Sequence, residues 1–285
     1  MIKTLLTTLK QDKETFEVPK SVQDAIPIRR LWPDGIFQFG TKYSKTIRFS
    51  DINYAIASKE DKTSMFLGYS ELLNALDTGS TTKITINNKR VNREDFEREI
   101  LLPRQDDALD GYRAEYNAML MDKVTDSSNS VVQERYITVS THKKNVDEAR
   151  TFFHRVIGDV TSRLNKLDSH SEELDAIERL RILHDFYRVG EETEFHFNLK
   201  DSMRKGASYK DAICPDSMEF KKDHFVMGDK FGRVLFLKEY ASYIKDSMIN
   251  ELTELNRTLM LSIDVIPVPT DEAVREMQNR LLGVE

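Results

Sequence analysis

The chain has 285 residues, of which 39% are hydrophobic and 32% charged, and its net charge is −6 with a pI near 5.7. This is enough for a buried core in one large domain or two lobes, and the negative charge argues against general electrostatic binding to nucleic acid. The single cysteine, Cys214, excludes an internal disulfide, and no apolar run approaches the roughly 20 residues that a membrane-spanning helix needs. With no signal-peptide pattern at the N-terminus, we expect a cytoplasmic protein.

Residues 1–40 are predicted to form an irregular N-terminal arm, because they contain three of the seven prolines and no sustained period. The arm carries a candidate interaction surface of two arginines among apolar side chains: Ile26, Ile28, Arg29, Arg30, Leu31 and Trp32. An apolar stripe on an irregular segment must pack on something. Either the arm straps across its own domain, or it docks on a partner chain with the arginines at the rim, facing an acidic partner or anionic lipid head groups.

Residues 41–190 are predicted to form a first α/β lobe. A strand is expected over 45–54, and Ser58 with Asp61 forms a capping box that opens a helix. One face of this helix is predicted to be buried: Met65, Phe66, Tyr69, Leu72, Leu73 and Leu76. Alternating apolar residues then predict a strand over 84–86.

A helical excursion follows, with a short helix over 92–101 and a second over 112–120, before a strand over 131–140. Asn145 and Glu148 form another capping box, which opens a long helix. The apolar face of that helix consists of Ala149, Phe152, Phe153, Val156, Ile157, Val160 and Leu164. The succession of elements is typical of a ferredoxin-like split βαβ unit with a helical insertion, and the predicted fold class is α+β with mixed sheets and packed helices.

A last helix of the first lobe is expected over 171–188, since its sequence begins acidic and ends basic as the helix dipole prefers. Weak signals over 191–217 mark the expected boundary to a second α/β lobe, residues 191–285. In this lobe the GDKFG sequence predicts a hairpin between Val226 and the apolar run 234–237, with a positive φ at one of its two glycines.

The rest of the second lobe is predicted to be a helix from 243, a strand over 258–268 and a helix over 270–282. These elements are scaffold, and no arrangement of residues in them predicts chemistry.

One stretch of the chain partly matches the motif of a phosphate-binding loop. Gly35 to Lys42, GIFQFGTK, has the glycine spacing, but Thr41 stands where the lysine must be, and the interior FQF indicates a strand. The histidines His184 and His196 lie twelve residues apart, not at the spacing that presents two metal ligands on one helix face. Cys214 is interpreted as a packing residue. We therefore predict no catalytic, cofactor-binding or metal-binding residues in this chain.

Four long stretches in a fixed order carry a resemblance to a known family. They are FSDINYAIASKEDKTSMFLGYSELLNALDTGSTTKITINN (49–88), EELDAIERLRILHDFYR (172–188), GRVLFLKEYASYIKDSMINEL (232–252) and IDVIPVPTDEAVREMQNRLLGVE (263–285). Together they resemble the N-terminal region of conjugal-transfer ATPases. These are the traffic ATPases of type IV secretion systems, the TraE, TrbE and CagE kind, as carried by Gram-positive conjugative elements.

The resemblance implies an assembly and docking domain, whose partners are other subunits of the same ATPase and inner-membrane components of the secretion apparatus. It implies a location at the cytoplasmic face of the membrane, with peripheral membrane association and no direct contact with nucleic acid. ATP and magnesium are expected only for a motor domain that this chain does not contain, so the chain itself is not expected to be an enzyme. The alternative is a stand-alone enzyme or nucleic-acid-binding protein with an unrecognised site.

Overall fold

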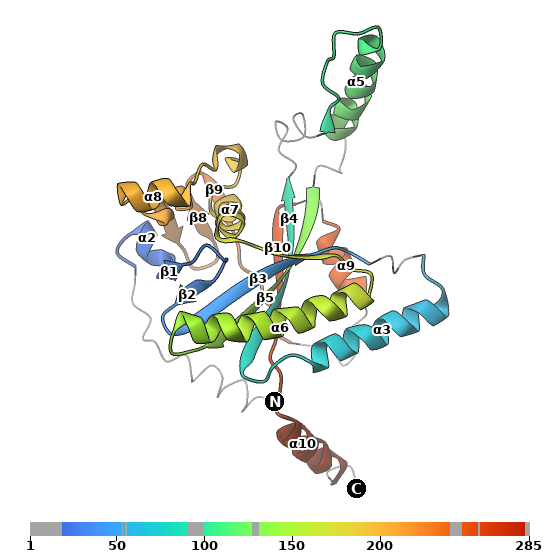
Figure 1. Ribbon diagram of the computed structural model, residues 1–285, viewed down its shortest axis with the longest axis vertical. Coiled ribbons are helices and arrows are strands. Elements are labelled where there is room, and N and C mark those ends of the chain that lie inside the picture. The colour runs from blue at the N-terminus through green and yellow to red at the C-terminus, as the bar shows by residue number, and fades with distance from the viewer. Residues whose placement is uncertain are drawn as a thin grey trace.

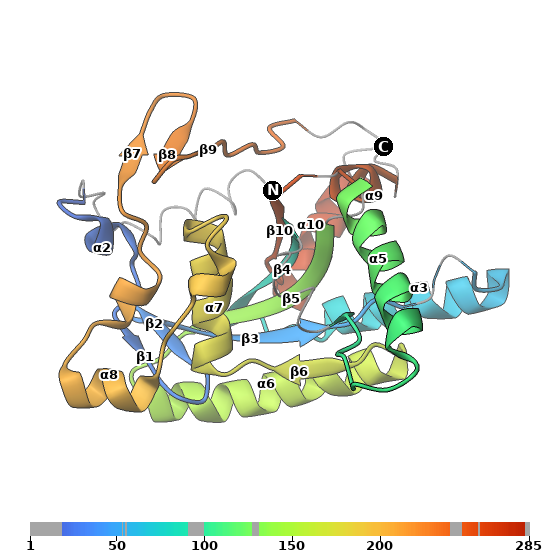
Figure 2. The same cartoon turned by 90° about the horizontal axis from the view of Figure 1, so that it is seen from above.

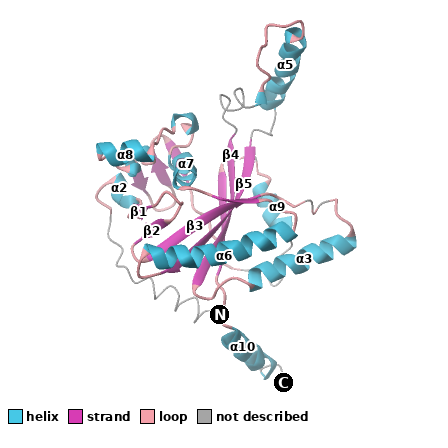
Figure 3. Ribbon diagram, viewed as in Figure 1, coloured by secondary structure: helices cyan, strands magenta, loops and turns pink. Residues whose placement is uncertain are grey.

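A computed structural model describes residues 19–52, 54, 56–90, 100–126, 131–239, 247–255 and 257–282. The fold is α+β, as predicted, and every strand pair in the described residues is antiparallel. Figure 3 shows the helices arranged around one large sheet. The predicted helix over 92–101 lies almost wholly outside the described residues, as does the start of the predicted helix at 243.

The main sheet has the order β1-β2-β3-β5-β4-β10, and β6 also pairs with β3. Its strands are β1 (Arg30–Leu31), β2 (Phe37–Phe39), β3 (Lys42–Phe49), β4 (Ser80–Arg90), β5 (Val131–His142), β6 (Ser171–Glu173) and β10 (Leu259–Val265). A small second sheet contains β7 (Met218–Phe220), β8 (Phe225–Met227) and β9 (Lys230–Gly232).

The described helices are α2 (Val22–Ala25), α3 (Lys59–Asn74), α5 (Asp110–Asp126), α6 (Val146–Lys166), α7 (Ala176–Tyr187), α8 (Leu199–Lys205), α9 (Ser247–Thr253) and α10 (Thr270–Leu282). Two short 3₁₀ helices are η1 (Glu192–Glu194) and η2 (Tyr209–Ala212). Helices α3 and α6 lie side by side on one face of the sheet, whereas α5 and α10 extend away from it (Figures 1 and 2).

The centre of the molecule is the predicted ferredoxin-like unit, β3-α3-β4-β5-α6-β6. Its four strands have the order β6-β3-β5-β4, so that β5 separates the parallel strands β3 and β4 of the split βαβ motif. The predicted helical insertion joins β4 to β5 and includes α5 (Figure 1).

Helix α6 supplies most of the first hydrophobic cluster. Its N-cap is Asn145, whose Oδ1 accepts a hydrogen bond from Glu148 N at 2.9 Å, as the capping box predicts. The whole predicted apolar face is buried: Ala149, Phe152, Phe153, Val156, Ile157, Val160 and Leu164. These side chains pack against Tyr43, Ile47 and Ile137 of the sheet to form cluster 1.

Helix α3 departs from the prediction along half of its length. Ser58 caps it and Leu72 and Leu76 are buried, but Phe66 and Tyr69 are 64% and 43% exposed. The N-terminal half of α3 runs past the edge of the sheet, so its apolar side chains have no surface to cover (Figure 1).

The segment predicted as one helix over 171–188 contains a strand and a shorter helix. Ser171–Glu173 is β6, which pairs with Phe49–Ile47 of β3. Asp175 then caps α7, and Glu178 completes its capping box. The local sequence does not show that one edge of β3 is free to pair with this segment. The backbone hydrogen bonds between β6 and that edge outweigh the helical pattern of residues 171–175.

A second hydrophobic cluster lies on the opposite face of the sheet, under α7. Cluster 2 consists of the buried residues Ile26, Ile28, Phe37, Ala176, Leu180, Phe195, Ile213 and Cys214. These residues come from the arm, from the first predicted lobe and from the segment after residue 190. The predicted boundaries at residues 40 and 190 therefore pass through one shared core.

The C-terminal segment also joins the main sheet. The predicted hairpin is present as β8–β9, and Gly228 has a φ of +57° in its two-residue loop. The run 234–237, however, is not a strand. Strand β10 pairs with β4 along its whole length, so the second predicted lobe does not form a large sheet of its own.

Candidate interaction surfaces

The predicted interaction surface on the arm is divided between the interior and the solvent. Ile26 and Ile28 are only 1% and 3% exposed, because both belong to cluster 2. Ile26 and Ile28 are therefore not available to another chain, and the prediction that they dock on a partner is wrong. This part of the arm packs across its own domain.

The other four residues of that surface are less buried. Arg29 and Arg30 are exposed, and their contact with an acidic partner or lipid stays a prediction. Leu31 packs against cluster 2 and Trp32 against cluster 1, where the ring of Trp32 lies 5.9 Å from that of Tyr43.

Hydrogen bonds to the arm's backbone explain why an irregular segment is held in place. Lys210 Nζ donates to Gln23 O at 2.7 Å and Ile26 O at 2.8 Å, and Tyr209 Oη donates to Ile28 O at 2.7 Å. Side chains of η2 thus hold three carbonyl groups of the arm, one of which, Gln23 O, also accepts the N–H of Ile26 at the end of α2.

The glycine-containing stretch Gly35 to Lys42 is a β-hairpin. Its FQF core is β2, which pairs with β3, as the sequence indicates. The other candidates are also structural. Cys214 is buried, and burial raises the pKa of its thiol, which disfavours the reactive thiolate. Within the described residues, no three His, Cys, Asp or Glu side chains are grouped to hold a metal ion.

A polar cluster links α7 to the sheet. Tyr136 Oη donates to Glu134 Oε2 at 2.6 Å, and Lys89 Nζ lies 3.1 Å from Glu134 Oε2 and 3.6 Å from Asp185 Oδ2. Burial, followed by the negative charge of Glu134, raises the pKa of Tyr136, so its hydroxyl stays protonated as a donor. These contacts fix the position of α7, and each carboxylate has a cation as its partner.

Arg179 on α7 is buried, and none of the described carboxylates pairs with it. Its guanidinium donates to Gly35 O at 2.7 Å, Ser44 O at 2.8 Å and Ser44 Oγ at 3.0 Å, and it stacks on Phe37 at 4.1 Å. Burial lowers the pKa of Arg179 to about 9, which keeps the side chain charged at neutral pH. Its role is to satisfy two backbone carbonyls beside cluster 2.

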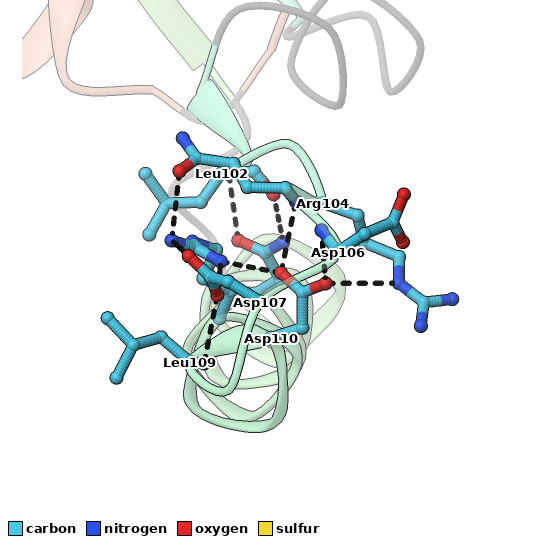
Figure 4. A network of polar contacts seen from close by, with 9 residues as sticks. Leu102, Arg104, Asp106, Asp107, Leu109 and Asp110 are labelled. Carbon is cyan, nitrogen blue, oxygen red and sulfur yellow. Dashed lines mark hydrogen bonds and ion pairs between the residues drawn. The ribbon is translucent and has the colours of Figure 1, made fainter.

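The insertion ends in a tip whose loop is fastened to α5 by a polar network (Figure 4). Arg113 Nη1 donates to Asp107 Oδ1 and Asp110 Oδ1, each at 2.5 Å. Asp110 also accepts hydrogen bonds from the backbone N–H groups of Gln105 and Asp106. These contacts order the loop on one side of α5.

Beside this network, α5 and the residue before it carry an exposed apolar stripe. Leu109, Tyr112, Tyr116 and Met119 follow helical spacing and are 44–71% exposed. We call these four residues the tip surface. The sequence predicted this helix, and because α5 projects away from the sheet its apolar stripe is exposed (Figure 1).

Two further apolar surfaces lie in the C-terminal part of the chain. The 234–237 segment, Val234 to Leu237, follows β9 and is 50–82% exposed. Helix α10 exposes Val274, Met277 and Leu281, which lie on one face and are 47–71% exposed. We call these three residues the α10 face.

The sequence predicts residues 234–237 as one side of a hairpin and residues 270–282 as a helix, both as scaffold and without a contact surface. Their periodicity is the same as that of a buried helix or strand, since period alone does not say whether a partner belongs to the same chain. A usable signal was present in the 234–237 segment, because basic residues bracket it at Arg233 and Lys238.

Comparisons with known proteins supply no relative. No family model matches the chain, and no curated protein matches it. No helix in the described residues is both long and apolar enough to cross a bilayer. The fold and these surfaces define the class as an α+β protein with a ferredoxin-like core and several exposed apolar surfaces.

Proposed function

We propose that the chain is an assembly and docking domain of a conjugal-transfer ATPase of a type IV secretion system. The observation that carries the proposal is the α10 face, where three large apolar side chains point into solvent at helical spacing. Exposed apolar surface of this kind marks protein–protein contact sites. The sequence resemblance supplies the particular family, and its partners are other ATPase subunits and inner-membrane components at the cytoplasmic face of the membrane.

A pull-down against the other components of the same secretion operon tests this function. The purified chain is expected to retain at least one membrane component in mild detergent, and Met277→Asp on the α10 face is expected to release it. Asn279→Asp is the matched control, because Asn279 is exposed on the same helix and is not three or four residues from any member of the apolar face. Failure to retain any component, or equal loss with both variants, contradicts the proposal.

The proposal assigns ATP hydrolysis to a motor domain outside this chain. The hairpin formed by Gly35 to Lys42 has strand geometry, whereas a phosphate site requires a loop of inward-pointing N–H groups. We therefore expect no magnesium-dependent ATP turnover by the purified chain in a steady-state assay. Turnover that Lys42→Ala abolishes would favour the alternative of a stand-alone enzyme.

A further inference from the structure

The main sheet ends in an exposed strand. Strand β10 pairs with β4 through all seven of its residues, and it is the last strand in the sheet order. In the part of the chain that the structure describes, all backbone partners of β10 belong to β4. Ser262, Ile263 and Asp264 are exposed. An edge of this kind presents a row of N–H and C=O groups that can pair with another strand.

The same chain contains a segment with the properties of a strand but no sheet to join. In the 234–237 segment, Val234 is 76% exposed, Leu235 82%, Phe236 80% and Leu237 50%. β-Branched and aromatic residues favour strands, and a β-strand added to an edge satisfies its backbone and buries alternate side chains. The segment is therefore complementary to the free edge of β10.

The charges around the two elements are also complementary. The segment is bracketed by Arg233 and Lys238; Arg233 already pairs with Asp223 at 3.4 Å, and Lys230 nearby pairs with Asp229 at 2.6 Å. Strand β10 carries Asp264, which pairs with Lys83 at 3.6 Å and stays 50% exposed, and the acidic pair Asp271 and Glu272 follows at the start of α10. Opposite charges on two such surfaces favour encounter and fix orientation.

We infer that the 234–237 segment of one copy adds as an extra strand to the β10 edge of a second copy. A second copy is the occupant because, in the part of the chain that the structure describes, the side chains of the segment are exposed and the edge strand is paired only on its β4 side. The inference rests on the proposed function in one respect: it names the surface through which subunits of the ATPase join.

Disulfide trapping between two populations of the full chain tests the pairing. In a Cys214→Ala background, one population carries Ser262→Cys on β10, and the other carries a single cysteine at position 234, 235, 236 or 237. Directly opposite residues in an antiparallel pair have Cβ atoms roughly 4.5–5.5 Å apart, and successive side chains point to opposite faces. Disulfide-linked heterodimers are therefore expected mainly at alternate positions, either 234 and 236 or 235 and 237.

Three outcomes of the trapping experiment overturn the inference. These are equal cross-linking at all four positions, no cross-linking at any of them, and closure of the bond inside one chain when both cysteines are placed on the same molecule. The last outcome assigns the segment to the chain's own edge.

Sedimentation of the chain with its native Cys214 gives an independent measurement. Phe236→Asp is expected to weaken self-association by about tenfold or more, because it puts an unpaired carboxylate in a dehydrated contact. Its melting temperature is expected to stay unchanged, since Phe236 is exposed. Phe220→Asp is the matched control, because Phe220 is an exposed phenylalanine on β7 outside the segment. Equal effects of the two variants on association, or no self-association by the parent chain, overturn the inference.

The proposed function survives such a failure if the chain still retains a membrane component of its operon. Conversely, self-association without any retained component leaves the strand pairing standing and contradicts the docking role. The two proposals therefore fail on different measurements.

Discussion

At the scale of single residues, Thr82 is a polar group in an apolar place. The residue is 1% exposed, and its Oγ1 has no hydrogen-bond partner among the described residues. It borders a cavity of about 10 Å³ that is otherwise lined by aliphatic side chains from α3, α6 and the sheet. A water molecule there would lack the two or more polar partners that hold buried water.

Thr82→Val is therefore expected to stabilise the fold by about 1 kcal/mol, because valine has the same shape and removes the unpaired hydroxyl. Urea denaturation measures the change. Thr46→Val is the matched control: the hydroxyl of Thr46 lies 2.9 Å from that of Thr138, so this variant is expected to destabilise the fold by about as much. A stability loss in both variants would contradict the account of Thr82.

Gly35 is fixed by both its backbone angle and its surroundings. Its φ is +78°, and a Cβ atom at this position would lie 2.0 Å from the carbonyl oxygen of Leu174. Gly35→Ala is expected to cost more than about 3 kcal/mol in the free energy of unfolding, since the obstacle is backbone that cannot rotate away.

Gly206 separates the cost of the positive φ from the cost of the steric contact. Its φ is +67°, but nothing lies within 4 Å of a Cβ built on it. Gly206→Ala is expected to cost only about 1 kcal/mol, the penalty for a left-handed residue in open space. Similar losses for the two variants in urea denaturation would show that the contact with Leu174 is unimportant.

At the scale of elements, the tip of the insertion is held by charges. The hydrogen bond from Arg113 lowers the pKa of Asp107, and hydrogen bonds from the backbone N–H of Gln105, together with Arg113, lower that of Asp110. Both values lie below the ordinary 3.8. The stability that these carboxylates contribute is complete above that pH and is lost as the pH falls through the lowered values.

We expect the loop of the tip to lose hydrogen-exchange protection at pH 3 relative to pH 5, after correction for intrinsic rates. The amides of Gln105 and Asp106 report the change, because both donate to Asp110. Amides in the middle of α6, such as those of Phe153 and Val156, are the reference, since their acceptors are backbone carbonyl groups of the helix. Asp110→Asn is expected to remove most of the pH dependence, and unchanged behaviour in this variant would contradict the explanation.

Elements with local causes could be predicted from the sequence. The capping box at Asn145 and the seven apolar positions of α6 gave its start and its buried face, because the helical period and the cap act within a few residues. The turn at Gly228 was predictable for the same reason, since a two-residue hairpin loop needs a positive φ.

Elements with distant partners could not be predicted in this way. Strand β6 exists because β3 has a free edge more than a hundred residues earlier in the chain. The strand predicted over 258–268 is present as β10, but its local sequence did not predict that it pairs with β4 of the main sheet. The interaction surfaces were missed for a related reason. An apolar stripe on α5 or α10 has the same sequence pattern as one that is buried in its own chain.

At the scale of the whole molecule, the β1–β2 hairpin lies between the two hydrophobic clusters and contributes residues to both. Neighbouring residues alternate between them: Trp32 packs in cluster 1 and Leu31 in cluster 2, while Ile36 belongs to cluster 1 and Phe37 to cluster 2. The alternation follows from the two faces of a strand. The clusters are therefore expected to unfold together.

Phe37→Ala tests this coupling. Removal of the Phe37 ring from cluster 2 is expected to lower the free energy of unfolding by about 3–5 kcal/mol. The unfolding transition that Trp32 fluorescence reports in cluster 1 is then expected to shift to a lower urea concentration. Labelling of the Cys214 thiol reports cluster 2, and its midpoint is expected to shift by the same amount. Phe220→Ala, an exposed control, is expected to leave both midpoints unchanged. Early labelling of Cys214 with an unchanged Trp32 transition would mean that the clusters unfold separately.

The position of cluster 2 in the chain also has a consequence during synthesis on the ribosome. All fully buried members of cluster 1 have been synthesised at Leu164, whereas cluster 2 needs Ile213 and Cys214. At translation rates of about 5–20 residues per second, the intervening 50 or so residues take roughly 3–10 s. During that interval Phe37 is first without any cover and then covered by α7 alone, until Phe195, Ile213 and Cys214 are made. This face is therefore a place where a ribosome-associated chaperone would bind.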